Sequence, residues 1–224
     1  MKSPATGQEG APHVPDFEGA ASFGGEMMHA SAWQGAEAQR GKRALVVGFG
    51  NSGSEIAMDL WEHGANVTVA VRSPINVVPR WLMELYPHGN GLLRAIERWY
   101  MPPWISDIIG HLIVNPLLYR DLPSLGLQLS SRGVKTSLIN LHRAPLMDIG
   151  TIDLIRKRQV AVESRHLARF TAGGATFCDA DGVCDAQKFA AGDRDLLMIS
   201  ARITYDGGRF SLALKLATRL GEVT

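Results

Sequence analysis

A glycine-rich turn between an apolar run and an amphipathic segment constrains the fold more than any other feature. Residues 44–47, Ala-Leu-Val-Val, form a continuous apolar run that is typical of a buried strand. The run ends at Gly48 and Gly50, and residues 54–63 then carry apolar side chains at helical spacing. Gly64 follows, at the position where glycine commonly ends a helix. The pattern predicts a strand, a tight turn and a helix in that order.

A second strand is predicted directly after this helix. Val67, Val69 and Val71 alternate with Thr68 and Ala70, which is the two-residue period of a β-strand. Two strands joined by a helix form a βαβ unit, and such units are parallel and right-handed. We therefore expect an α/β fold of the Rossmann type, with a parallel sheet built on residues 44–47 and 67–71.

The turn itself has the spacing G-x-G-x-x-G over Gly48–Gly53. The first glycine permits the tight turn, and Gly50 lets a pyrophosphate approach the backbone. Gly53 lets the helix pack closely against the strand, and the helix N-terminus offers free N–H groups to phosphates. The motif alone is weak, but its place between a strand and a helix predicts a dinucleotide site. The alternative is a glycine-rich turn that holds no ligand.

The end of the second predicted strand indicates which dinucleotide binds. A site for NAD carries an acidic residue there, which accepts hydrogen bonds from the ribose hydroxyls. This chain has Arg72 and Ser73 at that point, with no acid between Glu62 and Glu84. A guanidinium can bind a 2′-phosphate through a planar, bidentate contact. NADPH is the predicted cofactor, and the alternative is that Arg72 is a solvated strand end.

The rest of the chain divides into segments of different character. Residues 1–40 are rich in Gly, Pro and Ala and are expected to form loops and turns. Residues 80–122 are predicted to be helical, as a subdomain packing on the sheet or, alternatively, as a lid facing lipid or substrate. Residues 148–158 predict a short helix, and Val160 with Val162 begins a further strand.

Composition excludes several classes of function. Lys and Arg number 23 against 22 Asp and Glu, and a net charge of +1 offers no field for nucleic acids. Cys178 and Cys184 are too few for a disulfide scaffold, are not spaced as C-x-x-C, and lack partners for a metal site. The chain shows no export signal, and residues 103–119 are too short and polar to span a bilayer. We expect a cytoplasmic protein with no membrane span.

Three motifs in order make the sequence similar to the flavin-containing monooxygenases, a family of flavoproteins with two dinucleotide domains. Ala5, Thr6 and Gly7, with two prolines and a glycine behind them, resemble the family's crossover. A second motif, F-x-G-x3-H-x3-aromatic, matches Phe23, Gly25, His29 and Trp33. The third is the family's second nucleotide fingerprint, G-x-G-N-S-G-x-E, which adds Asn51, Ser52 and Glu55 to the glycines. Arg72, Ser73 and residues 148–151 are most similar to the branch of plant auxin-forming enzymes and bacterial relatives.

This resemblance implies a division of the chain. Residues 1–40 would be a remnant of the FAD-domain crossover with its linker, and 41–165 the NADPH domain with a helical insertion at 80–122. Residues 166–224 would be a divergent tail, because the pattern of the family is lost from Cys178 to Asp195. The family's first fingerprint, for FAD, precedes the crossover, so we expect an internal fragment with an incomplete FAD site that packs poorly over 1–40 and 178–224.

The resemblance implies chemistry in which NADPH reduces FAD and one oxygen atom of O2 passes to a small organic substrate. His29 would belong to a linker that couples the two cofactor domains, and the alternative is a structural histidine within a turn. No residue is predicted to be catalytic and none to bind metal. Two other functions stay open: a module that binds NADP(H) without turnover, and a truncated, inactive product.

Overall fold

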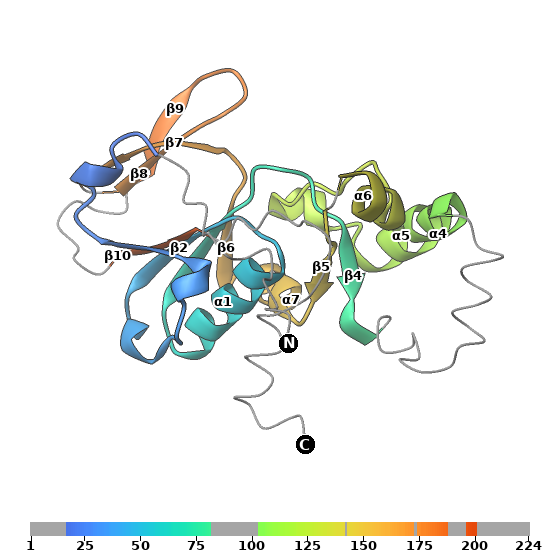
Figure 1. The fold of residues 1–224 in the computed structure, drawn as a ribbon, viewed down its shortest axis with the longest axis horizontal. Helices are drawn as coiled ribbons and strands as arrows, with labels where there is room; N and C mark the ends of the chain where they lie inside the picture. Colours follow the sequence, from blue (N-terminus) through green and yellow to red (C-terminus); the bar gives the residue numbers. More distant parts are fainter. Residues whose placement is uncertain (1–16, 82–102, 142, 173, 188–195, 201–224) are drawn as a thin grey trace, which may run out of the picture.

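The computed structural model describes residues 17–81, 103–141, 143–172, 174–187 and 196–200. Its centre is a five-stranded sheet in which every pair of neighbouring strands is parallel. Helices cover one face of this sheet and a smaller antiparallel sheet covers the other, as Figure 1 shows. The predicted α/β class with a parallel sheet is confirmed.

The strand order of the main sheet is β1-β10-β2-β3-β6. The strands are β1 (Glu26–His29), β10 (Leu196–Ser200), β2 (Arg43–Val47), β3 (Asn66–Ala70) and β6 (Val160–Glu163). The predicted βαβ unit is β2, helix α1 (Asn51–Glu62) and β3. Because β10 lies on the opposite side of β2 from β3, the order of the strands reverses between β2 and β10.

Helix α1 fills the space above β2 and β3 with its apolar side chains. Ile56, Ala57 and Leu60 are completely buried there, with Val46 and Val69 beneath them. The predicted helix end is also confirmed, because Gly64 has a φ of +82°, a conformation that favours glycine. The short helix predicted near residue 150 is α7 (Thr151–Arg156), which contacts α1 and β6.

The other face of the main sheet is covered by an antiparallel sheet in the order β7-β8-β9. Its strands are β7 (His166–Thr171), β8 (Gly174–Cys178) and β9 (Cys184–Gln187). Phe170 and Phe177 pack from this sheet against Leu45 of β2, and the whole cluster is buried. Strand β9 lies in the stretch where the pattern of the family is lost, and its polar residues are organised by pairing with β8. The predicted poor packing from residue 178 onward is therefore wrong for β9.

The two cysteines form a disulfide, Cys178–Cys184, between register partners of β8 and β9. The sequence excluded a cysteine scaffold and a C-x-x-C motif, but it did not predict this cross-strand bond. Within the described ranges no group of three or more metal-ligating side chains could hold a metal ion.

Residues 17–40 contain more structure than the predicted loops and turns. Glu26–His29 is the edge strand β1, and three short 3-10 helices lie around it: η1 (Ala20–Ser22), η2 (Ala30–Ala32) and η3 (Glu37–Gln39). The prediction of loop is wrong for β1 because a four-residue strand carries too little periodicity to be recognised. Its partner β10 lies more than 160 residues later, at Leu196–Ser200. The predicted poor packing is wrong for Phe17 and Phe23, whose rings contact Phe170.

The segment from β4 to β5 includes the predicted helical insertion at residues 80–122, and it begins and ends with these two short strands. It contains β4 (Val77–Pro79), α4 (Pro103–Ile109), η4 (Gly110–Val114), α5 (Asn115–Leu118), η5 (Leu122–Leu125), α6 (Val134–Leu141) and β5 (Leu146–Asp148). Strand β4 pairs in parallel with β5 in a separate two-stranded sheet. Helix η4 has π-type geometry. The predicted helix over 82–102 lies outside the described residues.

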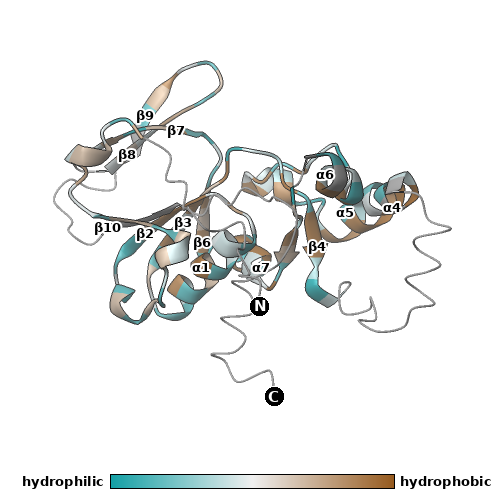
Figure 2. Ribbon diagram, viewed as in Figure 1, coloured by the Kyte–Doolittle hydropathy of each residue, from teal (hydrophilic) through white to brown (hydrophobic). Residues whose placement is uncertain are grey.

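Only part of this insertion packs against the core. Tyr119, Leu122 and Leu127 are buried in the main cluster, as predicted for a subdomain on the sheet. By contrast, Leu112 and Leu117 of the preceding helical run are more than 70% exposed, and Figure 2 shows apolar colour along α4 and α5. None of the described helices has the length and apolar character needed to cross a membrane.

Candidate dinucleotide-binding site

The glycine turn joins the end of β2 to the start of α1. Gly48 has a φ of +103°, a backbone angle that residues with a Cβ rarely adopt, so glycine is required for the turn. Its N–H donates to the carbonyl of Ala70, 2.9 Å away, and this bond fixes the turn against the end of β3. The first glycine therefore has the structural role that the fingerprint predicts.

Gly50 is the residue before the first turn of α1, and space is open above it. A Cβ built on Gly50 would meet no atom within 4 Å, and no side chain caps the helix. The first N–H groups of a helix have no partners within the helix, and they attract anions. The turn thus leaves both room and hydrogen-bond donors for a pyrophosphate, as the sequence predicts for a nucleotide.

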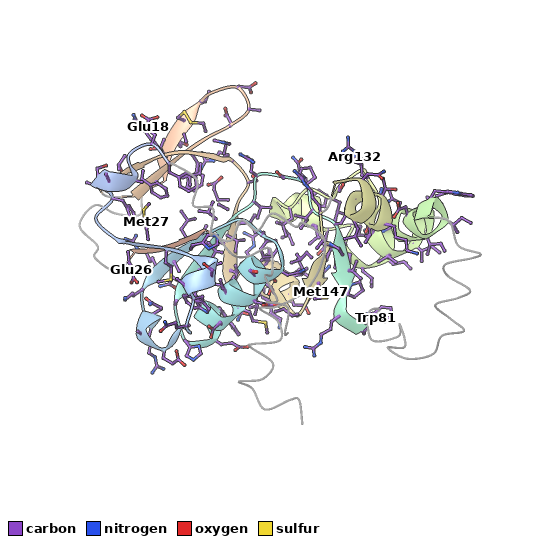
Figure 3. The ribbon with its side chains drawn as sticks, viewed as in Figure 1. Glu18, Glu26, Met27, Trp81, Arg132 and Met147 are labelled. Atoms are coloured by element: carbon purple, nitrogen blue, oxygen red, sulfur yellow. A yellow bond between two sulfur atoms is a disulfide. The ribbon has the colours of Figure 1, made fainter. Side chains whose placement is uncertain are left out.

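Polar residues at the start of α1 fasten this helix to β5 and α7. The side-chain oxygen of Asn51 accepts a hydrogen bond of 2.7 Å from the backbone N–H of Met147, near the position labelled in Figure 3. The hydroxyl of Ser54 donates to that of Thr151 at 2.9 Å, and Thr151 donates to the Ser54 carbonyl. Ser52 is buried, with 6% of its surface exposed. These side chains hold the N-terminus of the helix in place, a role that the motif alone did not reveal.

Arg72 lies two residues after the end of β3, at the carboxyl edge of the sheet. Its side chain is exposed, and within the described part of the chain no hydrogen bond or ion pair holds it. Ser73, the other predicted residue here, is half-buried. The arrangement leaves a guanidinium available to a ligand at the strand end where the ribose of a dinucleotide binds.

The nearest acid on the neighbouring strand does not substitute for the acidic residue of an NAD site. Glu163, the register partner of Ala70, is only 5% exposed, and Arg165 donates to both of its carboxylate oxygens at 2.9 Å. Burial works against its ionisation, but the hydrogen bonds from Arg165 outweigh burial and lower the pKa of Glu163 below its usual value. A carboxylate that is already paired is a poor acceptor for ribose hydroxyls.

The second predicted motif surrounds β1 and contacts both faces of the sheet. The ring of Phe23 lies 5.2 Å from that of Phe170 on the antiparallel side, and Gly25 immediately precedes β1. On the helical side, the indole N–H of Trp33 donates to a carboxylate oxygen of Asp59 at 2.9 Å. Ala5, Thr6 and Gly7, the predicted crossover, lie outside the described residues.

Glu55 is a feature of the site that the sequence did not single out for chemistry. One carboxylate oxygen is buried and has no hydrogen-bond partner, and burial raises the pKa of Glu55 to about 7. Glu55 lies one helical turn before Asp59, on the side of α1 that faces Trp33. A buried carboxylate oxygen without a partner is costly, and only the fold, not the spacing of the motif, shows that this side chain is half-buried.

These features define the class of the fold as an α/β dinucleotide-binding domain. They are a glycine turn after a strand, an open helix N-terminus and the exposed Arg72 after the next strand. Comparison with known proteins makes the class more specific. The profile of the flavin-binding monooxygenase-like family matches residues 4–164. The chain belongs to this family, as the three sequence motifs predict.

Similar proteins include plant monooxygenases. The chain is 36% identical over 180 residues to indole-3-pyruvate monooxygenase YUCCA1 of Oryza sativa subsp. japonica, covering 75% of this chain and 42% of that protein. It is 31% identical over 175 residues to YUCCA4 of the same plant, covering 78% of this chain and 39% of that protein. The chain therefore spans about two fifths of the length of these relatives.

Solved structures confirm the fold. Cyclohexanone monooxygenase from Rhodococcus sp. Phi1, bound to NADP+, superimposes with a TM-score of 0.57 at 16% identity. The match covers 86% of this chain and 44% of that one. An open crystal structure of cyclohexanone monooxygenase gives the same TM-score, with 88% of this chain covered.

Proposed function

We propose that this chain is the NADPH-binding portion of a flavin-dependent monooxygenase that oxygenates a small organic substrate with O2, FAD and NADPH. The observation that carries the proposal is the pairing of an open glycine cradle at Gly50 with an unpaired Arg72. The cradle fits a pyrophosphate, and the cation fits the 2′-phosphate that distinguishes NADPH from NADH. Relatives named as monooxygenases support the wider role.

The chain's own residues bind and orient the nucleotide in this proposal. Gly48 shapes the turn, Gly50 leaves the approach to the backbone clear, and Gly53 brings the helix close to the sheet. Asn51 and the buried Ser52 hold the helix N-terminus in position, and Arg72 with Ser73 binds the 2′-phosphate. NADPH supplies a hydride when it is bound, and FAD supplies the oxygen chemistry.

Binding of FAD is proposed to need residues beyond those of this chain. The sequence contains one complete G-x-G-x-x-G, at Gly48–Gly53, and Arg72 suits that site to the nicotinamide dinucleotide. In the proposed division, residues 1–40 belong to the crossover and linker, 41–165 to the NADPH domain, and 166–224 to the segment that follows. A chain that binds NADP(H) without turnover is the second candidate, and the single G-x-G-x-x-G of the sequence favours it.

The test is to titrate the purified chain with NADPH and NADH by calorimetry, in parallel with Arg72→Ala. Loss of one charge-assisted phosphate contact costs about 1.5–3 kcal/mol, so NADPH affinity should fall by one to two decades. NADH affinity should stay nearly unchanged. Arg132→Ala, which removes an exposed arginine from the segment before α6, is the matched control and should change neither value. Equal weakening of both nucleotides by Arg72→Ala would refute the role of the 2′-phosphate.

The second arm of the test concerns flavin. The purified chain should be colourless after dialysis and should consume no NADPH above background. A yellow protein with near-stoichiometric FAD would contradict the proposal that the flavin site is incomplete. A colourless chain that binds NADPH distinguishes the nucleotide-binding portion from an inactive product with no ligand.

A further inference from the structure

The helical run of α4, η4 and α5 exposes a continuous set of large apolar side chains. Six of them, each with between 42% and 73% of its surface exposed, are Trp104, Ile108, Ile109, Leu112, Ile113 and Leu117. Figure 2 shows their apolar colour along α4 and α5, at the end of the molecule away from the antiparallel sheet. Single apolar residues are normal on a protein surface, but a contiguous set of this size marks an interaction site.

These six side chains form two rows on one side of the run. The first row is Trp104, Ile108 and Leu112, and the second is Ile109, Ile113 and Leu117. Positions four apart in an α-helix drift by about 40° around the axis, because one turn takes 3.6 residues. The wider π-type turn of η4 drifts in the opposite direction, so each row stays straight. The two rows together make one apolar stripe about 20 Å long.

The polar side of the same run is fastened to α6. Carboxylate oxygens of Asp107 accept the backbone N–H groups of Lys135 at 2.8 Å and Thr136 at 3.0 Å, near the start of α6. One helical turn later, Nε2 of His111 lies 2.8 Å from the backbone carbonyl of Ser131. These contacts fix the rotation of the run about its own axis. The apolar stripe therefore faces away from α6, and its exposure is built into the fold.

The apolar stripe carries no charge, and this limits what can cover it. Residues 103–118 contain no lysine or arginine, and their single acid, Asp107, is turned toward α6. A helix that lies on a lipid surface has a polar side rich in lysine and arginine, which attract anionic head groups. An uncharged stripe instead fits an equally uncharged protein surface. A second copy of this chain presents such a surface.

The exposed area of the apolar stripe is close to that of a standard protein interface. A large side chain that is fully exposed has on the order of 200 Å² of surface, so the exposed fractions leave roughly 700 Å² on one copy. An interface of ordinary size buries about 800 Å² on each partner, whereas the largest apolar patch of a typical monomer is about 300–600 Å². Two such stripes in contact bury enough area for a stable dimer.

We propose that the apolar stripe is a dimer interface, in which the helical run of one copy packs antiparallel against that of a second copy. In a two-fold dimer each contact occurs twice, with the two copies exchanged. Antiparallel alignment about the middle of the stripe pairs each member of one row with a member of the other. The pairs are Trp104 with Leu117, Ile108 with Ile113, and Ile109 with Leu112.

This dimer leaves the candidate dinucleotide site accessible. Figure 1 shows α4 and α5 at one end of the molecule, apart from the start of α1 where the glycine turn lies. The proposal therefore goes beyond the proposed function and does not depend on it. Substitutions in the stripe should leave NADPH affinity within twofold of wild type, and Arg72→Ala should leave the dimer unchanged.

Sedimentation equilibrium on the full chain tests the dimer. The wild-type chain should be dimeric at micromolar concentrations. Leu112→Glu should weaken the dimer by at least about thirtyfold, because it places an unpaired charge at the centre of the interface. Because Leu112 is exposed in the single chain, circular dichroism should show that this variant still folds. Val183→Glu is the matched control: Val183 is exposed between β8 and β9, and its replacement should leave the dimer within twofold of wild type.

A mixture of two variants tests the antiparallel pairing itself. Leu112→Glu and Ile109→Lys each place an unpaired charge in the interface, so each variant alone should be monomeric. Mixed in equal amounts, the two should form a heterodimer, because antiparallel alignment brings the new carboxylate beside the new ammonium group. In a parallel pair each of these residues meets its own counterpart, so a mixture that stays monomeric refutes the antiparallel arrangement.

Three results would overturn the proposal. The first is a wild-type chain that stays monomeric up to about 100 μM, a concentration well above that expected for an interface of this size. The second is a dimer that Leu112→Glu leaves intact, which would place the interface elsewhere on the chain. The third is binding of a monomeric wild-type chain to vesicles of phosphatidylcholine and phosphatidylserine that Leu112→Glu abolishes, which would assign the stripe to a lipid surface.

Discussion

Substitution of Gly50 should separate binding from folding, because the backbone there is unstrained and the space above it is open. Gly50 has a φ of −102° and a ψ of −166°, an extended conformation that alanine adopts, and its added Cβ would meet no atom within 4 Å. Alanine is a weaker residue than glycine before a helix, so Gly50→Ala should cost at most about 1 kcal/mol of unfolding free energy. The methyl group would stand where a pyrophosphate oxygen has to approach the backbone. Loss of one hydrogen bond to a charged acceptor is worth about 1.5–3 kcal/mol, or ten- to a hundredfold in NADPH affinity.

Gly48→Ala is the matched control, since it lies in the same turn but at a φ of +103°. A side chain in that region costs about 1–3 kcal/mol, so this variant should lose stability as well as binding. Thermal unfolding and calorimetric titration with NADPH, run on both variants, give the comparison. The reasoning is refuted if Gly50→Ala binds NADPH as tightly as wild type, because no phosphate could then lie against that backbone.

Three more substitutions test individual contacts. Glu55→Gln should stabilise the fold by about 2 kcal/mol at pH 8, after allowance for the partial exposure of the side chain. Burial raises the pKa of Glu55 from 4.5 to about 7, so ionising the carboxyl in the folded state costs free energy that glutamine avoids. Near pH 4 the carboxyl is protonated in both the folded and the unfolded chain, so the substitution should have no effect there. Glu163→Gln should destabilise the fold by about 2 kcal/mol at neutral pH, because the lowered pKa of Glu163 reflects its pairing with Arg165. The difference in stability between wild type and Glu163→Gln should shrink as the pH falls below 4.5 and disappear once the pH is below the lowered pKa of Glu163. Chemical denaturation across the pH range measures the effects of both the Glu55 and the Glu163 substitutions. Trp33→Phe removes the bond to Asp59 and should lower the unfolding free energy by about 1.5 kcal/mol, as chemical denaturation would measure.

The parts of the fold that sequence predicts are those whose signals are local. The βαβ unit follows from an apolar run, a glycine turn, a helical period and an alternating strand, all within residues 44–71. Its helix ends at Glu62, and Gly64 terminates it as expected. The strands that were not predicted depend on distant partners. Glu26–His29 pairs with Leu196–Ser200, and β4 pairs with β5 across the whole insertion.

The site divides in the same way. The positions of Gly48 and Gly50 follow from their spacing, since a turn and a helix start are local structures. The bond from Met147 to Asn51 joins segments far apart in the chain, whereas the burial of Glu163 and of a carboxylate oxygen of Glu55 depends on enclosure by the fold. No spacing rule encodes such contacts, so they become visible only in three dimensions.

Strand order explains how two motifs that are separate in the sequence come to share one edge of the sheet. In the described chain, β1 has a single pairing partner, β10, and β10 in turn pairs with β2. The histidine motif therefore reaches the carboxyl edge beside the glycine turn only after Leu196–Ser200 has been added between them. This dependence assigns the last described strand a role beyond closing the sheet. It sets the two-strand spacing between His29 and the glycine turn, so residues 196–200 fix how the motif around β1 is placed relative to the βαβ unit.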